Sequence, residues 1–246
     1  MRLLEPPARI TDKTKSRDTG TIAFWRLWNR FRMTLQFAIS ALLTLFVVVD
    51  PVALAPTFLV VTERMPRKSR RDVAVRASII AGAILIGAAL IGDWLLNTLA
   101  ISLSAFRIAG GLLLFSIATE MVFGVRSRHE GEAAEEALEE RVRNVAAFPL
   151  AIPLLAGPGA ITATVLLAGR AHSDVGDLGD LVQLTILIVA IVAVAAASLV
   201  SFLCAEWIGA LIGVTGNIVL SRLLGVLLAA LAVQYVVDGI RAVLAG

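Results

Sequence analysis

The chain has 246 residues, of which 58% are hydrophobic and only 17% are charged, and its mean hydropathy is +0.86. Soluble domains carry about 25% charged residues, whereas apolar runs of about 20 residues, such as those in this chain, have the length that crosses a bilayer. The composition therefore excludes an ordinary soluble protein, and the pI near 9.6 does not imply a nucleic-acid partner, because membrane proteins also gather basic residues in their hydrophilic gaps.

The first 33 residues are predicted to be a basic extension ahead of the first apolar run. Residues 1–32 contain eight Arg or Lys residues, which disfavours their transfer across a membrane. Three explanations stay open: translation starts at Met33, the segment is a disordered extension, or it is a basic arm whose Trp25 and Trp28 lie on the membrane surface. No cleavable signal peptide is predicted, because the first apolar run is too long and has no small-residue cleavage site.

Six apolar runs follow, each close to the roughly 20 residues that a helix needs to cross the hydrocarbon core. They are continuous rather than alternating, which favours helices over strands. The runs cover residues 35–61, 73–91, 105–125, 145–168, 181–205 and 218–237. The sequence thus predicts an all-α membrane protein with six transmembrane helices. A hydrophilic segment at 126–144 divides them into two groups of three, at 34–125 and 145–246.

The charges in the hydrophilic segments predict the orientation. The segments after the first and third runs carry nine Arg or Lys residues, which places both in the cytoplasm by the positive-inside rule. The segment at 126–144 also contains six glutamates and is predicted to be a short, solvated acidic helix. An even number of spans then puts both termini on the periplasmic side of a bacterial inner membrane.

A charged residue interrupts the first apolar run, where Asp50 is followed by Pro51 and Pro56. An ionised carboxylate near the bilayer centre costs about 2.5–3.5 kcal/mol on insertion scales, so such residues face protein or a polar cavity. Each proline lacks an N–H and frees the carbonyl four residues before it, at Val47 and Val52. We expect the helix to bend or unwind here, and Asp50, Pro51 and Pro56 to line a substrate site.

The fourth run is interrupted more strongly, by three prolines and two glycines between residues 149 and 159. Proline costs about 3 kcal/mol in a helix interior and glycine about 1 kcal/mol, so two half-helices that meet at residues 156–159 are expected. The free amides of Gly159, Ala160 and Ile161 would attract a carboxylate. The predicted site residues on this side are Gly157, Pro158, Gly159, Ala160 and Thr162. The alternative is that both breaks only adjust helix packing.

Residues 93–126 resemble residues 206–241, which indicates an internal duplication. Asp93-Trp94 returns as Glu206-Trp207. After a slip of two residues, Arg107, Gly110, Gly124 and Arg126 correspond to Arg222, Gly225, Gly239 and Arg241. Each group has three spans, an odd number, so the second group would enter the membrane from the opposite face. The repeat is therefore predicted to be inverted.

The repeated arginines have two interpretations that stay open. Arg107 and Arg222 are either anchors, held by headgroups or by an ion pair, or gates that close opposite sides in turn. The partner in an ion pair would be the acidic residue of the preceding run, Asp93 or Glu206. The neighbouring glycines are expected to allow close helix packing. Further candidate polar partners are Glu120, Gln234 and Asp238.

The sequence predicts no enzyme and no metal site. The two histidines, His129 and His172, lie in different hydrophilic segments, which disfavours a shared zinc ion. It contains no Gly-rich phosphate loop and no nucleophile–base motif, which argues against an ATP-driven pump or an intramembrane enzyme. No cofactor is expected, apart from a proton or sodium ion that could be coupled to transport.

Four segments resemble the MarC family of integral membrane proteins: Asp50-Pro51, Arg107-Ile-Ala-Gly-Gly, the run from Pro149 to Ile161, and Arg222-Leu-Leu-Gly. The resemblance covers essentially everything after residue 33. It implies a six-span inner-membrane protein of the lysine-exporter type of transporters, with small neutral amino acids as cargo. Members of the family commonly have Asn-Pro in place of Asp50-Pro51, which implies that a carboxylate is not essential there.

These features predict a secondary transporter that works by alternating access, with its site at the bilayer midplane between the two breaks. Half-helix amides would hold the carboxylate of an amino acid, and Asp50 would hold its amine or a coupling cation. The expected partners are the lipid bilayer and a small-molecule substrate, while a homo-oligomer is left open. The alternative from another class is a non-transporting scaffold or sensor that acts through the acidic segment at 126–144.

Overall fold

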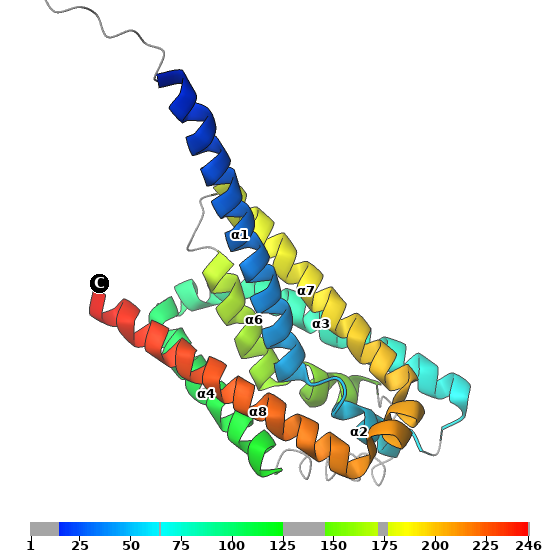
Figure 1. Cartoon of the computed structure of the whole chain (residues 1–246). Helices are drawn as coiled ribbons and strands as arrows, with labels where there is room; N and C mark the ends of the chain where they lie inside the picture. Colours follow the sequence, from blue (N-terminus) through cyan, green and yellow to red (C-terminus); the bar gives the residue numbers. More distant parts are fainter. Residues whose placement is uncertain (1–14, 64, 125–145, 172–176, 246) are drawn as a thin grey trace, which may run out of the picture. The chain divides into compact units, whose positions relative to one another are not determined.

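The structure is a computed structural model that describes residues 15–63, 65–124, 146–171 and 177–245. Every regular element in these residues is a helix, and none of them is a strand. In chain order the helices are α1 (Lys15–Val49), α2 (Leu54–Val61), α3 (Arg67–Thr98), α4 (Leu103–Phe123), η1 (Ala146–Leu155), α6 (Pro158–Ala171), α7 (Asp177–Leu203) and α8 (Ala205–Ala245) (Figure 1). The all-α class is confirmed for the described residues.

The chain divides into two compact units, residues 1–37 and residues 38–246. The first unit holds the N-terminal part of α1, which includes residues 15–33 of the expected extension. The contacts and sites described below belong to the second unit. The acidic segment at 126–144 lies outside the described residues.

Five stretches in the described residues are long and apolar enough to cross a membrane. They are Arg32–Val49, Arg67–Thr98, Leu103–Phe123, Asp180–Leu203 and Thr215–Ala245. The expected span at 145–168 is not among them, because the chain forms two shorter helices there, η1 and α6. Two expected helices are longer in the structure: α3 begins before the run at 73–91, and α8 extends beyond both ends of the run at 218–237. The end turns of both helices contain charged or polar residues, so an apolar run in the sequence stops before the helix itself ends.

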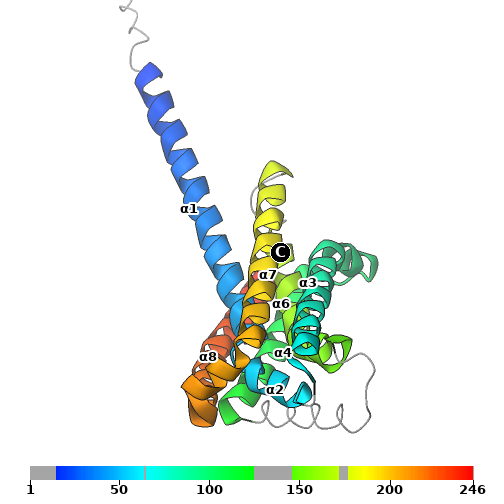
Figure 2. The ribbon, with the colours of Figure 1, turned by 90° about the vertical axis from the view of Figure 1, so that its right-hand side faces the viewer.

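Helix α6 lies in the interior, whereas its longer neighbours expose apolar side chains. Eleven of the 14 residues of α6 are buried, and the helix packs against α3, α4 and α7 (Figure 2). By contrast, Val189 on α7 and Leu223 on α8 are 62% and 61% exposed. A long helix with an apolar exposed face is suited to contact with lipid. The second broken segment is therefore held by protein on several sides.

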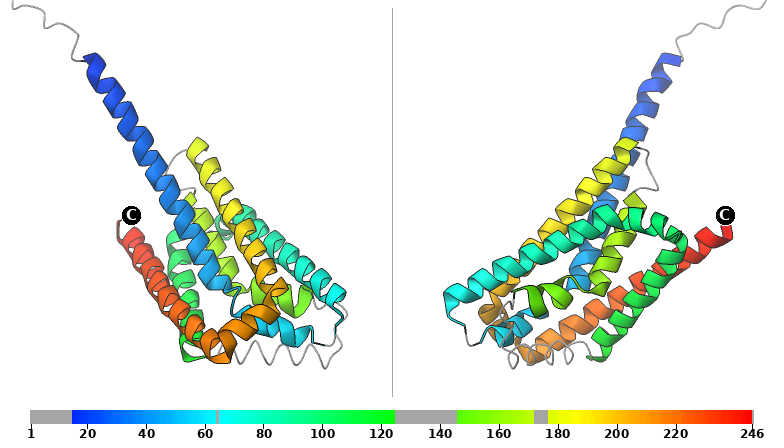
Figure 3. Two further views of the ribbon diagram at one scale, coloured as in Figure 1. Left: turned by 45° about the vertical axis from the view of Figure 1, so that its right-hand side comes forward. Right: turned by 180° about the vertical axis from the view of Figure 1, so that it is seen from behind.

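Helices α4 and α8 pack side by side and antiparallel (Figure 3). A Cβ atom at Gly111 of α4 would lie 2.8 Å from the carbonyl oxygen of Ala232, and one at Gly225 of α8 would lie 3.1 Å from that of Ala118. Small residues let helix backbones approach in this way where no hydrophobic force drives helices together. The expected packing role of Gly111 and Gly225 is confirmed.

Both copies of the repeated segment bend at the same position. The link between α3 and α4 contains Ala100 with a φ of 53°, and α8 contains Gly213 with a φ of 63° and a non-helical ψ of 178°. Each lies seven residues after the acidic residue that starts its copy, Asp93 or Glu206. Gly213 thus separates a short first segment of α8 from the long stretch that could span the membrane.

Candidate functional site

The first break is a turn centred on Asp50. Helix α1 ends at Val49, Asp50 has a φ of 50°, and α2 begins at Leu54. The Asp50 amide still donates to the carbonyl of Phe46 at 2.9 Å, and its carbonyl accepts from the Leu54 amide at 3.2 Å. A left-handed conformation is unfavourable for most residues, but Asp tolerates it because its short side chain can bond locally. The chain therefore turns at Asp50 without leaving its backbone groups unsatisfied.

The Asp50 side chain is buried and joins two helices. It is only 2% exposed, its Oδ1 accepts from the Ala53 amide at 3.3 Å, and its Oδ2 accepts from the Ser221 hydroxyl at 3.0 Å. Ser221 is 7% exposed and lies on α8, directly before Arg222. Ser221 was not among the residues predicted from the sequence. One feature of the sequence could have pointed to it: the residue that corresponds to Ser221 in the first copy of the repeated segment is Phe106, so the hydroxyl occurs in the second copy alone.

The two prolines near Asp50, Pro51 and Pro56, free fewer backbone carbonyls than expected from the sequence. Pro51 is buried beside Asp50. Pro56 is the third residue of α2, where an amide would have no partner within the helix in any case. The carbonyl of Val52, which was expected to be free, accepts from the Ala55 amide at 3.2 Å. The expectation of a free carbonyl at Val52 is therefore wrong, because Pro56 falls in a first turn rather than in a helix interior.

The second break lies between η1 and α6, at Ala156 and Gly157. The Ala156 amide donates to the carbonyl of Ala151 five residues earlier, and Pro158 begins α6 as expected. The Ile161 amide donates to the Gly157 carbonyl at 3.0 Å, so the expectation that Ile161 offers a free amide is wrong. The amides of the two preceding residues, Gly159 and Ala160, have no acceptor among the described residues.

The start of α6 lies against the end of α1. A Cβ atom at Gly159 would lie 3.4 Å from Cγ1 of Val48, two residues before Asp50. It would also overlap Cδ1 of Ile117 on α4. Gly159 and Ala160 are buried, whereas Gly157 is half-buried and Pro158 is exposed. The two breaks, which are more than 100 residues apart in the sequence, are thus neighbours in space.

Thr162 faces α4 with its methyl group. Its Cγ2 would lie 2.7 Å from a Cβ atom at Gly110, and Thr162 is 7% exposed. The hydroxyl of Thr164, one half-turn further, donates to the Ala160 carbonyl at 2.7 Å. Gly110 therefore serves the packing of α4 on α6, and the hydroxyl of Thr164 is used within its own helix.

A small cavity connects the two breaks with α3 and α7. It has a volume of about 10 Å³, and its lining includes Val49, Leu155, Ser78 and Ser198. Ser78 is 4% exposed, and its hydroxyl has no partner among the described residues. About 10–15 Å³ is the least space that holds one water molecule, so the region is closed to anything larger. Ser78 and Ser198 are further polar residues near the breaks that the sequence analysis did not select.

The repeated arginines have different surroundings. Arg107 is half-buried, and its Nε is buried without a partner among the described residues. Arg222 is exposed. Neither forms the expected ion pair, because Glu206 pairs with Arg70 at 3.0 Å and Asp93 accepts from Asn97 at 3.2 Å. The ion-pair interpretation is therefore wrong, while the headgroup anchor and the gate stay predictions.

A polar cluster lies further along α6 and α8. Arg170, in the last turn of α6, pairs with Asp238 at 3.1 Å, and its guanidinium carbon lies over the ring of Tyr235, 4.5 Å from the ring centroid. Asp238 also accepts from Gln234 at 2.7 Å, and the buried Tyr235 hydroxyl is within hydrogen-bonding reach of Thr44 on α1. Gln234 and Asp238 were expected to be polar partners, whereas Arg170 lies beyond the expected run at 145–168 and was not among the predicted residues. The cluster links α1, α6 and α8.

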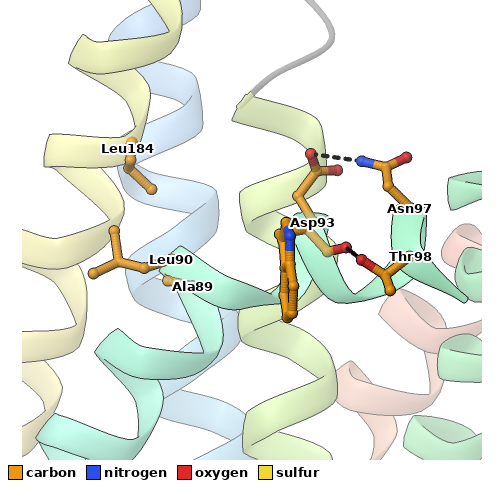
Figure 4. A pocket seen from close by; sticks show the side chains of 7 residues that line it. Ala89, Leu90, Asp93, Asn97, Thr98 and Leu184 are labelled. Atoms are coloured by element: carbon orange, nitrogen blue, oxygen red, sulfur yellow. Dashed lines mark hydrogen bonds between the residues drawn. The ribbon is translucent and has the colours of Figure 1, made fainter.

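A larger surface pocket lies elsewhere, at the end of α3. It has a volume of about 540 Å³ and lies between α3 and α7 (Figure 4). Its polar groups include Asp93, Asn97 and Thr98, and the Asp93 carboxylate is already bonded to Asn97. Trp94 on its rim is 64% exposed, as is common for tryptophan at a membrane–water interface. No predicted substrate residue lines this pocket, so we place the candidate site at the two breaks.

Comparison with known proteins identifies the family. The family model for MarC family integral membrane proteins matches residues 35–244. A UPF0056 membrane protein of Methanocaldococcus jannaschii is 41% identical over 216 residues, which cover 86% of this chain and 100% of that protein. A UPF0056 membrane protein of Archaeoglobus fulgidus is 35% identical over 84% of this chain and 93% of its own length.

The similarity extends to bacteria, and it covers nearly the whole chain. UPF0056 membrane protein YhcE of Escherichia coli is 33% identical over 211 residues, which cover 82% of this chain and 91% of that protein. No solved structure matches. Together with the apolar helices, these matches identify a multi-pass integral membrane protein. The chain belongs to the MarC family.

Proposed function

We propose that this protein is a secondary transporter of small neutral amino acids or similar small metabolites. The observation that carries the proposal is the juxtaposition of two helix breaks, one with the buried Asp50 carboxylate and one with the start of α6. Discontinuous helices that meet inside a membrane protein are typical of transporter sites. A buried carboxylate within the membrane is also a functional feature by default, because it is costly to keep there.

The two breaks offer complementary groups to a zwitterion. The Asp50 carboxylate would bind a substrate amine or a coupling cation such as a proton or sodium ion. The amides of Gly159 and Ala160, at the positive end of the α6 dipole, would bind a carboxylate. The hydroxyl of Ser221 would keep Asp50 oriented while the substrate enters.

The site must open before it can bind such a substrate. The cavity at the breaks has a volume of about 10 Å³, whereas pockets for small molecules usually hold about 300–1,000 Å³. Ion pairs lie toward the two ends of the bundle: Arg70 pairs with Glu206, and Arg170 pairs with Asp238. We propose that these contacts break in turn during alternating access.

An inverted repeat would supply the motion. Its support is that α4 and α8 pack antiparallel, and that each copy bends seven residues after its acidic start, at Ala100 and Gly213. Six membrane-crossing segments, with η1 and α6 together forming the fourth, would place both termini on the periplasmic side of an inner membrane. We further propose that the protein is not an enzyme.

The test is transport by purified protein in proteoliposomes. Uptake of radiolabelled alanine is measured with and without a proton or sodium gradient, and protein-free liposomes are the control. Uptake above the control that Asp50→Ala removes supports the proposal, provided that the variant enters the liposomes in equal amount. No uptake of any small neutral amino acid, under either gradient, overturns it.

The rival is a scaffold or sensor that acts through the acidic segment at 126–144. What favours it is the charge of that segment, which carries six glutamates. Replacing residues 130–140 by a neutral linker of equal length distinguishes the two functions. A transporter keeps its uptake, whereas a scaffold loses its cellular phenotype and is unaffected by Asp50→Ala.

A further inference from the structure

Helix α2, the start of α3 and the junction of α7 with α8 come together at one end of the bundle (Figure 1). A third pocket lies among these elements. Its volume is about 200 Å³. One part of its lining is apolar, and the other part is charged and contains Arg67, Arg70, Arg71 and Glu206. Arg70 and Glu206 form one of the ion pairs proposed to break during alternating access, but none of these residues lines the proposed substrate site at Asp50. The pocket therefore requires an explanation of its own.

The apolar part of the lining is rigid and reaches the protein surface. Phe58 of α2 and Phe202 of α7 stack with their ring centroids 4.6 Å apart, and they are 2% and 3% exposed. Leu203, the last residue of α7, is 50% exposed beside them. This surface lies at the end of a helix that is long and apolar enough to cross the membrane. It suits an acyl chain or another apolar group next to the bilayer.

The charged part carries more positive than negative charge. Arg70 is fixed, because it binds Glu206 through Nη1 at 3.0 Å and donates to the carbonyls of Thr62 and Glu63 at 3.0 Å each. Arg67 is 91% exposed and only 3.9 Å from Glu206, and Arg71 is exposed without a partner among the described residues. Three arginines against one glutamate leave two positive charges facing the pocket.

The position of these arginines at the start of α3 makes a bound anion more favourable. They lie in the first two turns of α3, where the helix dipole is positive, and the first turn of α3 contains no acidic residue. Cations at this end of a helix are unfavourable unless a negative group offsets them. Glu206 is hydrogen-bonded to Arg70 and pairs with Arg67 only at 3.9 Å, beyond hydrogen-bonding distance, so the donors of Arg67 and Arg71 remain available to an external ligand. Arginine donors match the geometry of a phosphate group.

We propose that this pocket binds one anionic phospholipid. Arg67 and Arg71 hold the phosphate of its headgroup, Arg70 and Glu206 fix the wall behind them, and an acyl chain follows the surface formed by Phe202 and Leu203. A lipid fits better than a free phosphate, because the pocket combines a phosphate-binding rim with an apolar surface at a membrane interface. Basic pockets between the ends of membrane helices are suited to such headgroups.

The test counts the lipids that stay bound to the purified chain in native mass spectrometry. The probes are phosphatidylglycerol and phosphatidylcholine of equal chain length. The test variant is Arg67→Gln/Arg71→Gln, and the matched control is Lys68→Gln/Arg76→Gln, which removes the same charge from exposed positions of α3 that do not line the pocket. Thermal unfolding with each lipid gives a second measurement and reports whether each variant is folded.

The expected result is one phosphatidylglycerol retained at least about tenfold more strongly than phosphatidylcholine, with this preference lost in the test variant and kept in the control. The unfolding temperature should rise with phosphatidylglycerol only in the wild type and in the control. Equal retention of both lipids, or equal loss in both variants, overturns the proposal. Displacement of the lipid by millimolar inorganic phosphate also overturns it, because the pocket would then bind a soluble anion.

Discussion

The two helix breaks differ in what they offer a ligand. The first contributes a charged side chain, Asp50, in a left-handed turn that Ser221 of α8 supports. The second contributes backbone groups, because Pro158 starts α6 and the amides of Gly159 and Ala160 follow. The two breaks therefore present opposite charges, a full negative charge and a partial positive one.

This difference bears on what the site can bind. Two chemically identical breaks would select two like groups, whereas a carboxylate opposite a helix N-terminus selects a molecule with one positive and one negative end. The difference also determines how each break can be tested. A side chain can be removed by substitution, but backbone amides can only be crowded or displaced.

Substitution of Asp50 should have the largest effect. Asp50→Ala removes the charge, leaves the Ser221 hydroxyl without its acceptor and places alanine at a φ of 50°. We expect alanine uptake to fall at least about 100-fold, because removal of one partner of a buried, hydrogen-bonded charge pair costs about 2–5 kcal/mol of binding free energy. Uptake is measured in proteoliposomes at equal protein content.

Asp50→Asn is the matched control for this substitution. Asparagine tolerates the left-handed conformation, its Oδ1 can accept from the Ala53 amide, and its Nδ2 can donate to the Ser221 hydroxyl oxygen, so the turn should persist. If the charge binds the substrate amine, Asn raises the KM strongly without changing the unfolding temperature. If Asn transports as well as Asp, the charge is dispensable and the first break acts through its shape and hydrogen bonds alone.

Crowding of the second break should have the next largest effect. Gly159→Ala places a methyl group against Ile117 and close to Val48, and overpacking of this kind costs about 1–3 kcal/mol. We expect uptake to fall about tenfold or more. Gly87→Ala is the control, because nothing lies within 4 Å of a Cβ atom at Gly87 of α3. It should leave uptake unchanged.

A second substitution separates crowding from ligand binding. Ile117→Val/Gly159→Ala removes the methyl group that meets the new Cβ atom and leaves the α6 amides in place. Recovery of uptake in this double variant means that the backbone amides suffice at the second break. Continued loss, with an unfolding temperature restored to that of Ile117→Val, means that the space at Gly159 is itself occupied by substrate.

The sequence was informative where a single segment breaks a rule of membrane helices. The interruptions at Asp50 and at residues 156–159 were predictable because buried charge and proline act locally. Ser221 was not, because its contact with Asp50 spans 171 residues of the chain. Arg170 was not predicted either, because the last turn of α6 extends beyond the apolar run that ends at residue 168. Pro56 was misjudged because its effect depends on where α2 begins.

Loss of the serine at the first break should have a moderate effect. Ser221→Ala removes one hydrogen bond to Asp50, and a hydrogen bond to a charged group contributes about 1.5–3 kcal/mol. We expect the KM for alanine to rise about three- to tenfold, with a smaller change in maximal rate. Ser201→Ala is the control, since Ser201 is similarly buried, at 8% against 7% exposed, and lies on α7. Equal effects of both variants would assign Ser221 a packing role only.

Removal of the ion pairs at the two ends of the bundle should have the smallest effect on stability. It tests directly whether the site between the two breaks opens to one side of the membrane at a time. Glu206→Gln removes the ion pairs with Arg70 and Arg67, and Asp238→Asn removes the pair with Arg170; partly exposed pairs each contribute less than about 1 kcal/mol to the free energy of unfolding. If the pairs close opposite sides of one site, each variant should change the KM about two- to fivefold for substrate added from its own side only. Oriented vesicles with substrate inside or outside provide the measurement. A change of equal size from both sides would mean that the pairs only hold the bundle together, because a gate on one side cannot favour both directions equally.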